Sequence, residues 1–309
     1  MSGTGVYIGV DLGGTNVRAG VVTEGGDLLH WKEVPIQAAR GPEAGLKTIT
    51  HLVEDVTGGV DRRILALGIG STGPLDRDKG FIQNPYTLPG WENVDIVSPL
   101  QERFQVPAAL ENDADAAALG EAWVGAGSGV SSMVMITIGT GVGYSLITNG
   151  AIHRGVGGEH PEGGHIPIDP DGPECYCGAR GCLESLASGP AIASFARKIA
   201  CEKPDSFLGN LAAGLPDGLD DIDSRHVFEG ARAGDSACLK LVNQTAYHIA
   251  RGLITILMMI LPDVIVFTGG VVQSFDLLEP RIRQELDAIN VIIPAAEVKL
   301  VKSSLDQAG

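Results

Sequence analysis

The stretch that decides the fold reads Val6-Tyr7-Ile8-Gly9-Val10-Asp11-Leu12-Gly13-Gly14-Thr15-Asn16. Residues 6–10 predict a strand, and extended character resumes over residues 17–22 after the glycine-rich break. The break places the Asp11 carboxylate at a strand end. Two glycines that permit close backbone approach follow it, and then the hydroxyl of Thr15. This combination suits phosphate and Mg²⁺, although turn chemistry alone leaves a tight hairpin open as the alternative.

A similar unit recurs in the second half of the chain. Residues 133–138 predict a buried strand, and the break after it reads Gly139-Thr140-Gly141-Val142-Gly143. Residues 144–147 return to strand before a turn into residues 151–152. The recurrence predicts a duplicated lobe whose two loops face each other. The glycine run is similar to a dinucleotide fingerprint, but strand-like sequence follows it where a helix must begin, which excludes nicotinamide binding.

The remaining pattern is mixed α/β. We expect a helix over residues 42–56, a buried strand over residues 64–69, a long helix over residues 235–261, and a strand over residues 264–267 that leads into Gly269 and Gly270. Residues 209–223 are rich in Gly, Asp and Pro and predict a surface loop.

Length and charge bound the function. A chain of 309 residues exceeds the usual size of a single core, so we expect two lobes with a cleft between them. Lys and Arg number 22 against 38 Asp and Glu, and the net charge of −16 argues against nucleic acid and anionic lipid as partners. Residues 1–5 lack a signal-peptide pattern, and the longest apolar run, residues 252–261, is too short to span a membrane. We therefore expect a cytoplasmic protein.

Three of the five cysteines lie together as Cys175, Cys177 and Cys182, and His165 precedes them. Three thiolates and one imidazole form a complete tetrahedral set for a structural Zn²⁺, which holds a loop and does not activate water. The alternative, reduced thiols packed in a loop, fits poorly beside the neighbouring Pro and Gly residues.

Two pairs of polar residues point to a polar ligand. Glu162 and Glu184 bracket the cysteine cluster, and paired carboxylates accept hydrogen bonds from polar ligands, although each residue alone is explained as a surface charge. Asn112 and Asp113 follow an apolar stretch, residues 106–110, and precede an Ala-rich helix, which places them at a strand end and a helix start. Plain N-capping is the alternative for this second pair.

Four blocks, in order along nearly the whole chain, resemble the ROK family of bacterial sugar kinases. They are residues 11–16, residues 111–121, residues 139–143 and residues 175–184. The resemblance implies an α/β, actin/hexokinase/Hsp70-like (ribonuclease H-like) two-lobe ATPase fold with an interlobe cleft. The smaller lobe, residues 1–112, carries the first phosphate loop. The larger lobe, residues 113–309, carries the second phosphate loop, the zinc module and an adenosine loop.

The same resemblance implies an ATP-dependent hexose kinase of carbohydrate metabolism and glycolysis. Glucose is favoured over N-acetylmannosamine, N-acetylglucosamine and fructose, and a homodimer or homotetramer is expected. Asp113 matches the general base that takes the proton of the sugar hydroxyl. The implied sugar-binding residues are Asn84, Asn112, Asp113, Glu162, His165 and Glu184. The implied nucleotide-binding residues, with ATP and Mg²⁺, are Asp11, Gly13, Gly14, Thr15, Asn16, Gly139, Thr140, Gly141, Gly143, Gly269 and Gly270.

The sequence differs from the family pattern at two places, and two other functions were considered. Tyr144 and Ser145 follow Gly143 where the family often has more glycines, and the chain stops at Gly309 where related kinases continue into a last helix. The stretch around Asn84 is equally well explained as a structural turn. A family transcriptional repressor is disfavoured by the acidic charge and by the ten residues that precede Asp11. A non-catalytic sugar sensor is disfavoured by the retained Asp113 and glycine loops.

Overall fold

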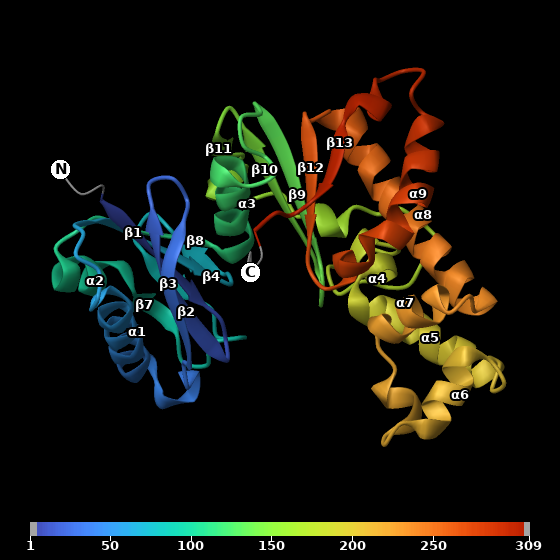
Figure 1. Ribbon diagram of the computed structural model, residues 1–309, viewed down its shortest axis with the longest axis horizontal. Coiled ribbons are helices and arrows are strands. Elements are labelled where there is room, and N and C mark those ends of the chain that lie inside the picture. The colour runs from blue at the N-terminus through green and yellow to red at the C-terminus, as the bar shows by residue number, and fades with distance from the viewer. Residues whose placement is uncertain (1–4, 306–309) are drawn as a thin grey trace. The chain divides into compact units, whose positions relative to one another are not determined.

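The computed structural model describes residues 5–305, which form two compact units over residues 5–124 and 125–305 (Figure 1). The chain start without a signal-peptide pattern (residues 1–4) and the chain end at Gly309 (residues 306–309) lie outside the described residues. This division places helix α3 (Asp113–Val124) in the first unit, whereas the boundary expected from the sequence, after residue 112, places it in the second.

The first unit contains a five-stranded sheet in the order β3-β2-β1-β4-β8 and a three-stranded sheet, β5-β6-β7. Its strands are β1 (Val6–Leu12), β2 (Asn16–Thr23), β3 (Leu28–Pro35), β4 (Ile64–Ser71), β5 (Leu75–Asp76), β6 (Phe81–Gln83), β7 (Glu92–Asp95) and β8 (Ala108–Asn112). Its helices are α1 (Pro42–Thr57), α2 (Val97–Phe104) and α3. These elements confirm the predicted helix over residues 42–56 and the strands over residues 6–10, 17–22 and 64–69.

Alternation along β1 explains how the first unit is layered. Ile8 and Val10 are buried and share a core with α1 and α2, where each buried aliphatic side chain contributes about 1.5–3 kcal/mol. Tyr7 points to the opposite face of the strand. Its ring meets the Trp123 ring of α3 at 89°, with the centroids 6.2 Å apart. Helices α1 and α3 therefore cover opposite faces of the five-stranded sheet.

The second unit repeats this sheet topology. Its strands are β9 (Ser132–Ile138), β10 (Val142–Thr148), β11 (Ala151–Ile152), β12 (Val264–Thr268) and β13 (Lys299–Lys302), in the order β11-β10-β9-β12-β13. In each sheet the middle strand pairs antiparallel with the next strand in sequence and parallel with a later one. Thus β1 pairs with β2 and β4 as β9 pairs with β10 and β12. The predicted duplication of the lobe is confirmed.

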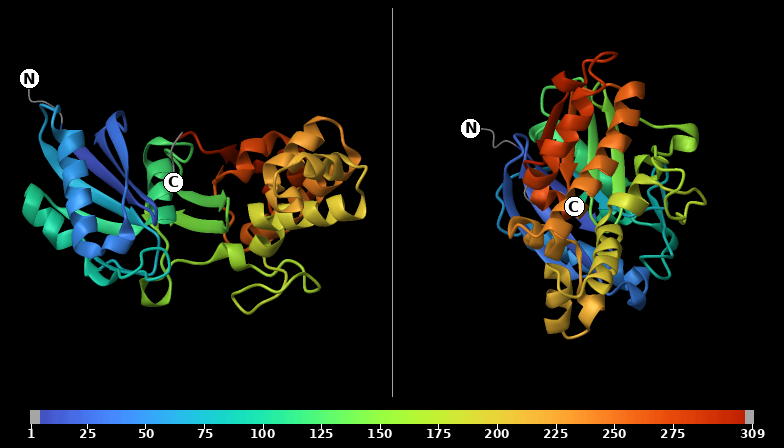
Figure 2. Two further views of the ribbon diagram at one scale, coloured as in Figure 1. Left: turned by 90° about the horizontal axis from the view of Figure 1, so that it is seen from below. Right: turned by 90° about the vertical axis from the view of Figure 1, so that its right-hand side faces the viewer.

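Helices make up most of the rest of the second unit. They are α4 (Leu183–Ala187), α5 (Gly189–Glu202), α6 (Phe207–Gly214), α7 (Ser224–Arg232), α8 (Ser236–Met259) and α9 (Phe275–Asp287). Helix α8 confirms the long helix that the sequence predicts, and α8 and α9 run side by side in Figures 1 and 2. Within residues 5–305, helices long and apolar enough to cross a bilayer are absent.

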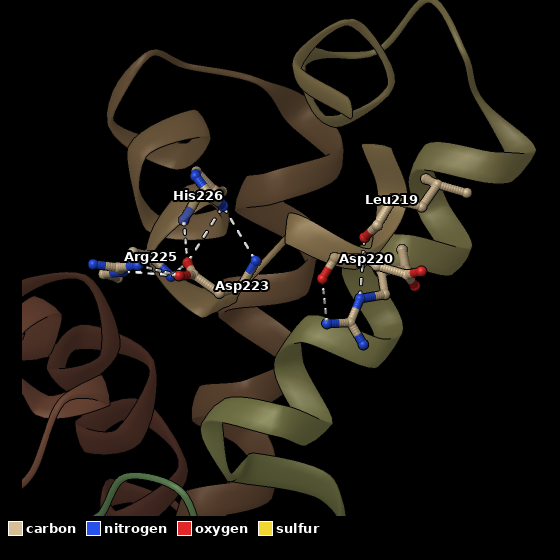
Figure 3. Close-up of polar contacts among 6 residues, drawn as sticks. Leu219, Asp220, Asp223, Arg225 and His226 are labelled. Atoms are coloured by element: carbon tan, nitrogen blue, oxygen red, sulfur yellow. Dashed lines mark hydrogen bonds and ion pairs between the residues drawn. The ribbon is translucent and has the colours of Figure 1, made fainter. Parts of the chain in front are cut away.

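The surface loop predicted over residues 209–223 is wrong. Helix α6 and a 3₁₀ turn (Gly218–Asp221) occupy most of it, because the Ser206 hydroxyl caps α6 and Leu208 is buried in the core. The turn is fixed by Arg197 of α5, which donates to the Leu219 and Asp220 carbonyls at 3.1 Å each (Figure 3).

Helix α7 begins directly after this segment with a capping box. Asp223 Oδ1 accepts from the His226 N–H at 3.4 Å, and the Asp223 N–H donates to His226 Nδ1 at 3.1 Å (Figure 3). Tertiary contacts and caps thus override the loop-like composition of residues 209–223.

Candidate functional site

Two polar side chains mark the junction of β8 and α3, where the sequence predicts them. Asn112 Oδ1 accepts from the N–H groups of Ala114 at 3.0 Å and Asp115 at 3.2 Å, which makes it the N-cap of α3. Its Nδ2 has no hydrogen-bond partner among the described residues. Asp113 Oδ2 accepts from the Thr72 hydroxyl at 2.9 Å, and its Oδ1 accepts from the Ala114 N–H at 2.8 Å. The cap therefore uses the oxygen of the Asn112 carboxamide but not its nitrogen. The hydrogen bond from Thr72 fixes the orientation of the Asp113 carboxylate.

Asn84 is fully buried and fixes Thr72. Its Nδ2 donates to the Thr72 carbonyl at 3.0 Å and to the Thr87 hydroxyl at 2.6 Å. Its Oδ1 accepts from the N–H groups of Tyr86 at 3.0 Å and Thr87 at 3.1 Å. These contacts use both donor hydrogens and both lone pairs of a carboxamide. The turn explanation for Asn84 is therefore supported, and the residue reaches Asp113 through Thr72.

Asp11 lies in an acidic environment at the end of β1. Its Oδ2 is 3.4 Å from Nη1 of Arg18, whose Nε is 2.5 Å from Glu33 Oε2. Glu33 also accepts from Asn16 Nδ2 at 2.8 Å. Burial raises the pKa of Asp11, Arg18 lowers it, and the carboxylates of Asp113 and Glu33 raise it again. Carboxylates close enough to repel are hard oxygen ligands that a divalent cation relieves, so Asp11 and Asp113 fit Mg²⁺.

The β1–β2 turn presents mainly backbone. The Gly13 N–H donates to the Asn16 carbonyl at 3.0 Å and closes the turn. A Cβ on Gly14 would lie 2.5 Å from the Thr87 carbonyl oxygen, so glycine is required there. Gly14 and Thr15 are exposed. The turn is a tight hairpin, which the sequence analysis left open as the alternative to a phosphate loop. Its exposed residues still suit contact with phosphate.

The corresponding turn of the second unit joins β9 to β10. The Gly139 N–H donates to the Gly141 carbonyl at 2.9 Å, and the Gly139 carbonyl accepts from the N–H of Gly189, the first residue of α5, at 2.8 Å. The Val142 N–H donates to Glu184 Oε2 at 2.8 Å. This turn is thus tied to the start of one helix and to a carboxylate from another.

The other predicted nucleotide residues of the second unit also lie at strand ends. Thr140 is exposed, whereas Gly143 is already part of β10, so the loop is shorter than the sequence predicts. Gly269 and Gly270 follow β12, and Gly269 approaches the carbonyl of Ile138 at the end of β9. The β9 and β12 turns are therefore neighbours.

A histidine and three cysteines lie together as the sequence predicts. The ligand atoms of His165, Cys175, Cys177 and Cys182 are all within 4.8 Å of one another. The Cys177 and Cys182 sulfurs are 3.6 Å apart, and Cys175 Sγ is 3.4 Å from His165 Nδ1. In a tetrahedral site with Zn–S near 2.3 Å, two sulfurs lie about 3.8 Å apart and sulfur and nitrogen about 3.6 Å apart. The cluster therefore fits Zn²⁺.

The loop that carries the cluster depends on tight turns. Gly181 has φ +59°, and a Cβ there would lie 1.6 Å from the Asp169 carbonyl oxygen, so the turn before Cys182 requires glycine. Backbone hydrogen bonding at Ala179 lowers the pKa of the Cys177 thiol, whereas burial raises that of Cys182 to about 12. Coordination to a cation deprotonates thiols, so a metal offsets the penalty of burying Cys182.

The sugar candidates of the second unit surround a side chain that the sequence analysis missed. The Tyr176 hydroxyl lies 3.0 Å from His165 Nε2, and the Glu184 carboxylate lies nearby. Desolvation first, and then neighbours that include the Glu184 and Glu162 carboxylates, raise the pKa of Tyr176 to about 12. Glu162 also lies 3.5 Å from His160 Nε2. The available signal was the position of Tyr176 between two cluster cysteines.

Comparisons with known proteins match nearly the whole chain. The model of the ROK family matches residues 7–309. The glucokinase of Thermotoga maritima is 34% identical over 288 residues, which cover 93% of this chain and 88% of its own. The N-acetylmannosamine kinase of Citrobacter koseri is 33% identical over 244 residues, which cover 79% and 76%. A crystal structure of a ROK family glucokinase from Streptomyces griseus in complex with glucose and AMPPNP is 32% identical. Its TM-score is 0.75, with 97% of this chain and 95% of that chain covered.

Proposed function

The chain belongs to the ROK family, and we propose that it is an ATP-dependent hexose kinase with glucose as its preferred acceptor. Its duplicated sheets have the actin/hexokinase-like fold of the family's sugar kinases. The choice of glucose is supported by the glucokinases from Thermotoga maritima and Streptomyces griseus, each above 30% identity over nine-tenths of the chain.

The observation that carries the proposal is the Asp113 carboxylate, aimed by the Thr72 hydroxyl at 2.9 Å. Asp113 accepts the proton of a hexose hydroxyl as its oxygen bonds to the γ-phosphorus of ATP. The bond from that phosphorus to the bridging oxygen breaks, and ADP leaves. When bound, Mg²⁺ neutralises phosphate charge, and Asp11 is the residue that holds it. Buried Asn84 keeps Thr72, and through it the base, in position.

The other roles follow from chemistry at each position. The Asn112 Nδ2, which the helix cap leaves without a partner among the described residues, donates to a sugar hydroxyl. Glu162, His165 and Glu184 bind further hydroxyls, on a loop that Zn²⁺ holds through the cluster. The β1–β2, β9–β10 and β12 turns contact the nucleotide, mainly through backbone N–H groups.

A coupled ADP assay against a panel of hexoses, with ATP and Mg²⁺, tests this function. We expect hexose-dependent ADP release with the highest kcat/KM for glucose. ADP release that no monosaccharide stimulates, from folded protein with one zinc per chain, would contradict the proposal.

A second candidate function differs only in substrate. The relative from Citrobacter koseri is an N-acetylmannosamine kinase at 33% identity, so an N-acetylhexosamine is the first competitor of glucose. The same panel of sugars distinguishes a glucokinase from an N-acetylhexosamine kinase, because the preferred substrate has the higher kcat/KM. Cytoplasmic location and a dimeric or tetrameric state stay predictions from the sequence, as does the absence of nucleic acid among the partners.

A further inference from the structure

Tyr176 stands at the centre of the sugar candidates of the second unit. Its hydroxyl is 3.0 Å from His165 Nε2, and the two rings meet edge to face at 89° with centroids 5.0 Å apart. The carboxylates of Glu184 and Glu162 also lie near enough to this hydroxyl to raise its pKa. Three residues with a proposed role in hexose binding therefore converge on one tyrosine oxygen.

The two nitrogens of His165 face different partners. Nδ1 faces the cysteine cluster, 3.4 Å from Cys175 Sγ, and Nε2 faces Tyr176. If Nδ1 is the metal ligand, Nε2 carries the hydrogen, because a neutral imidazole has one protonated nitrogen. His165 then donates to the Tyr176 hydroxyl oxygen. The only His165 nitrogen that a hexose can use is the one that Tyr176 holds.

The Tyr176 hydroxyl thus occupies the hydrogen-bonding nitrogen of His165 that a sugar hydroxyl would use. A sugar hydroxyl also accepts a hydrogen bond. We propose that Tyr176 is a placeholder for the hexose, whose hydroxyl displaces it from His165 Nε2 when the sugar binds. This inference rests on the proposed function. The displacement is sterically open, because the Tyr176 side chain is 83% exposed and has solvent to move into.

A placeholder competes with the ligand, so its removal strengthens binding. The free protein loses the hydrogen bond between Tyr176 and His165 on sugar binding, whereas a phenylalanine variant has no such bond to lose. Because a neutral hydrogen bond has a small net value, we expect Tyr176→Phe to bind glucose about two- to tenfold more tightly. A merely supporting tyrosine predicts weaker binding instead.

Calorimetric glucose titration of the zinc-loaded protein, paired with steady-state kinetics, tests the inference. The control is Tyr247→Phe, because Tyr247 is a partly exposed tyrosine of α8 whose ring contacts Arg281 and His248. We expect a lower Kd and a lower KM for Tyr176→Phe, and wild-type Kd, KM and kcat for Tyr247→Phe. Unchanged or weaker binding by Tyr176→Phe, in a protein that still phosphorylates glucose, overturns the inference and leaves the proposed function intact. A wild-type protein that neither binds nor phosphorylates any hexose overturns both.

A glucose complex of the wild-type protein gives a second readout that needs no variant. The inference expects the Tyr176 hydroxyl beyond hydrogen-bond distance of His165 Nε2 and a sugar oxygen within it. A complex in which Tyr176 keeps its contact with His165 overturns the inference.

Discussion

The two units share one sheet topology and differ in the side chains at their strand ends. In the first unit, β1 and the β8–α3 junction carry the carboxylates of Asp11 and Asp113. In the second, the strand equivalent to β1 leads into the Gly139 turn, which presents backbone. The same frame thus supports acid–base and metal chemistry in one copy and backbone recognition in the other. Duplication supplies the scaffold, and the residues at the strand ends determine the function.

The units also differ in how they hold a binding loop. The first uses ordinary hydrogen bonds, in which buried Asn84 fixes Thr72 and Thr72 fixes Asp113. The second uses a compact His/Cys cluster, on a loop with a turn that requires glycine at Gly181. A loop without a core of its own depends on a metal for its order. Removing one anchor in each unit should therefore have different consequences.

The largest expected effect is on turnover and comes from the first unit. Asp113→Asn keeps the shape of the side chain but removes the proton acceptor, so kcat should fall about 10²- to 10⁴-fold. Glucose binding should change little, because the amide still hydrogen-bonds. Steady-state kinetics and calorimetry measure the two effects, with the exposed Asp61→Asn as control. A kcat within tenfold of wild type would remove Asp113 from the role of base.

The second-largest expected effect is the loss of zinc and of glucose affinity when the cysteine cluster of the second unit is changed. Cys177→Ser should lose stoichiometric zinc and, with it, about tenfold or more in glucose affinity, because His165 and Glu184 lose their fixed orientation. Cys201→Ser is the matched control, since Cys201 is an exposed cysteine of α5 outside the cluster. Elemental analysis and calorimetry give both readouts. Full glucose affinity in a zinc-free Cys177→Ser protein contradicts this prediction.

A smaller effect separates capping from sugar binding at Asn112. Asn112→Ser keeps an oxygen that can cap α3 but loses the Nδ2 donor, and Asn112→Ala loses both. Both variants should raise the KM for glucose. Only Asn112→Ala should also lower the free energy of unfolding, by about 1 kcal/mol. Denaturant unfolding and kinetics check the pair, and an unchanged KM in both would leave Asn112 as a cap alone.

The smallest effect is on stability and concerns Asp11. Its pKa is raised above the ordinary 3.8, chiefly by burial, so the protonated form favours the fold. That contribution is complete below the unfolded pKa and is lost as pH rises through the folded-state pKa. Without Mg²⁺, Asp11→Asn should therefore raise the Tm slightly near neutral pH, and the difference should shrink as pH falls towards 4. A Tm lowered by Asp11→Asn at neutral pH would show that Asp11 stabilises the fold through Arg18.

Strong local patterns predicted much of this architecture. The strand around residues 6–10 and its repeat at residues 133–138 carry alternating or continuous apolar character, and the structure confirms both and the duplication that they indicate. The cysteine spacing predicted the cluster because few chemistries other than metal binding need three thiols and an imidazole together.

The features that the sequence analysis mispredicted or missed depend on tertiary contacts, which composition does not encode. Residues 209–223 contain loop-forming residues, yet Ser206, Arg197 and a buried Leu208 organise them into helix and turn. Asn84 stays predicted as a sugar residue, and the structure adds that its side-chain donors and acceptors are used by Thr72, Tyr86 and Thr87. Tyr176 was overlooked because its importance comes from Glu184, a neighbour supplied by a later helix.

Phosphorus NMR of wild-type protein with MgATP and glucose tests the central claim most directly, because it distinguishes transfer from hydrolysis. The claim is that Asp113 activates a hexose hydroxyl, so one new phosphate monoester should form for each ADP, with little inorganic phosphate. ADP that forms with an equal amount of inorganic phosphate, and without a sugar phosphate, would contradict it.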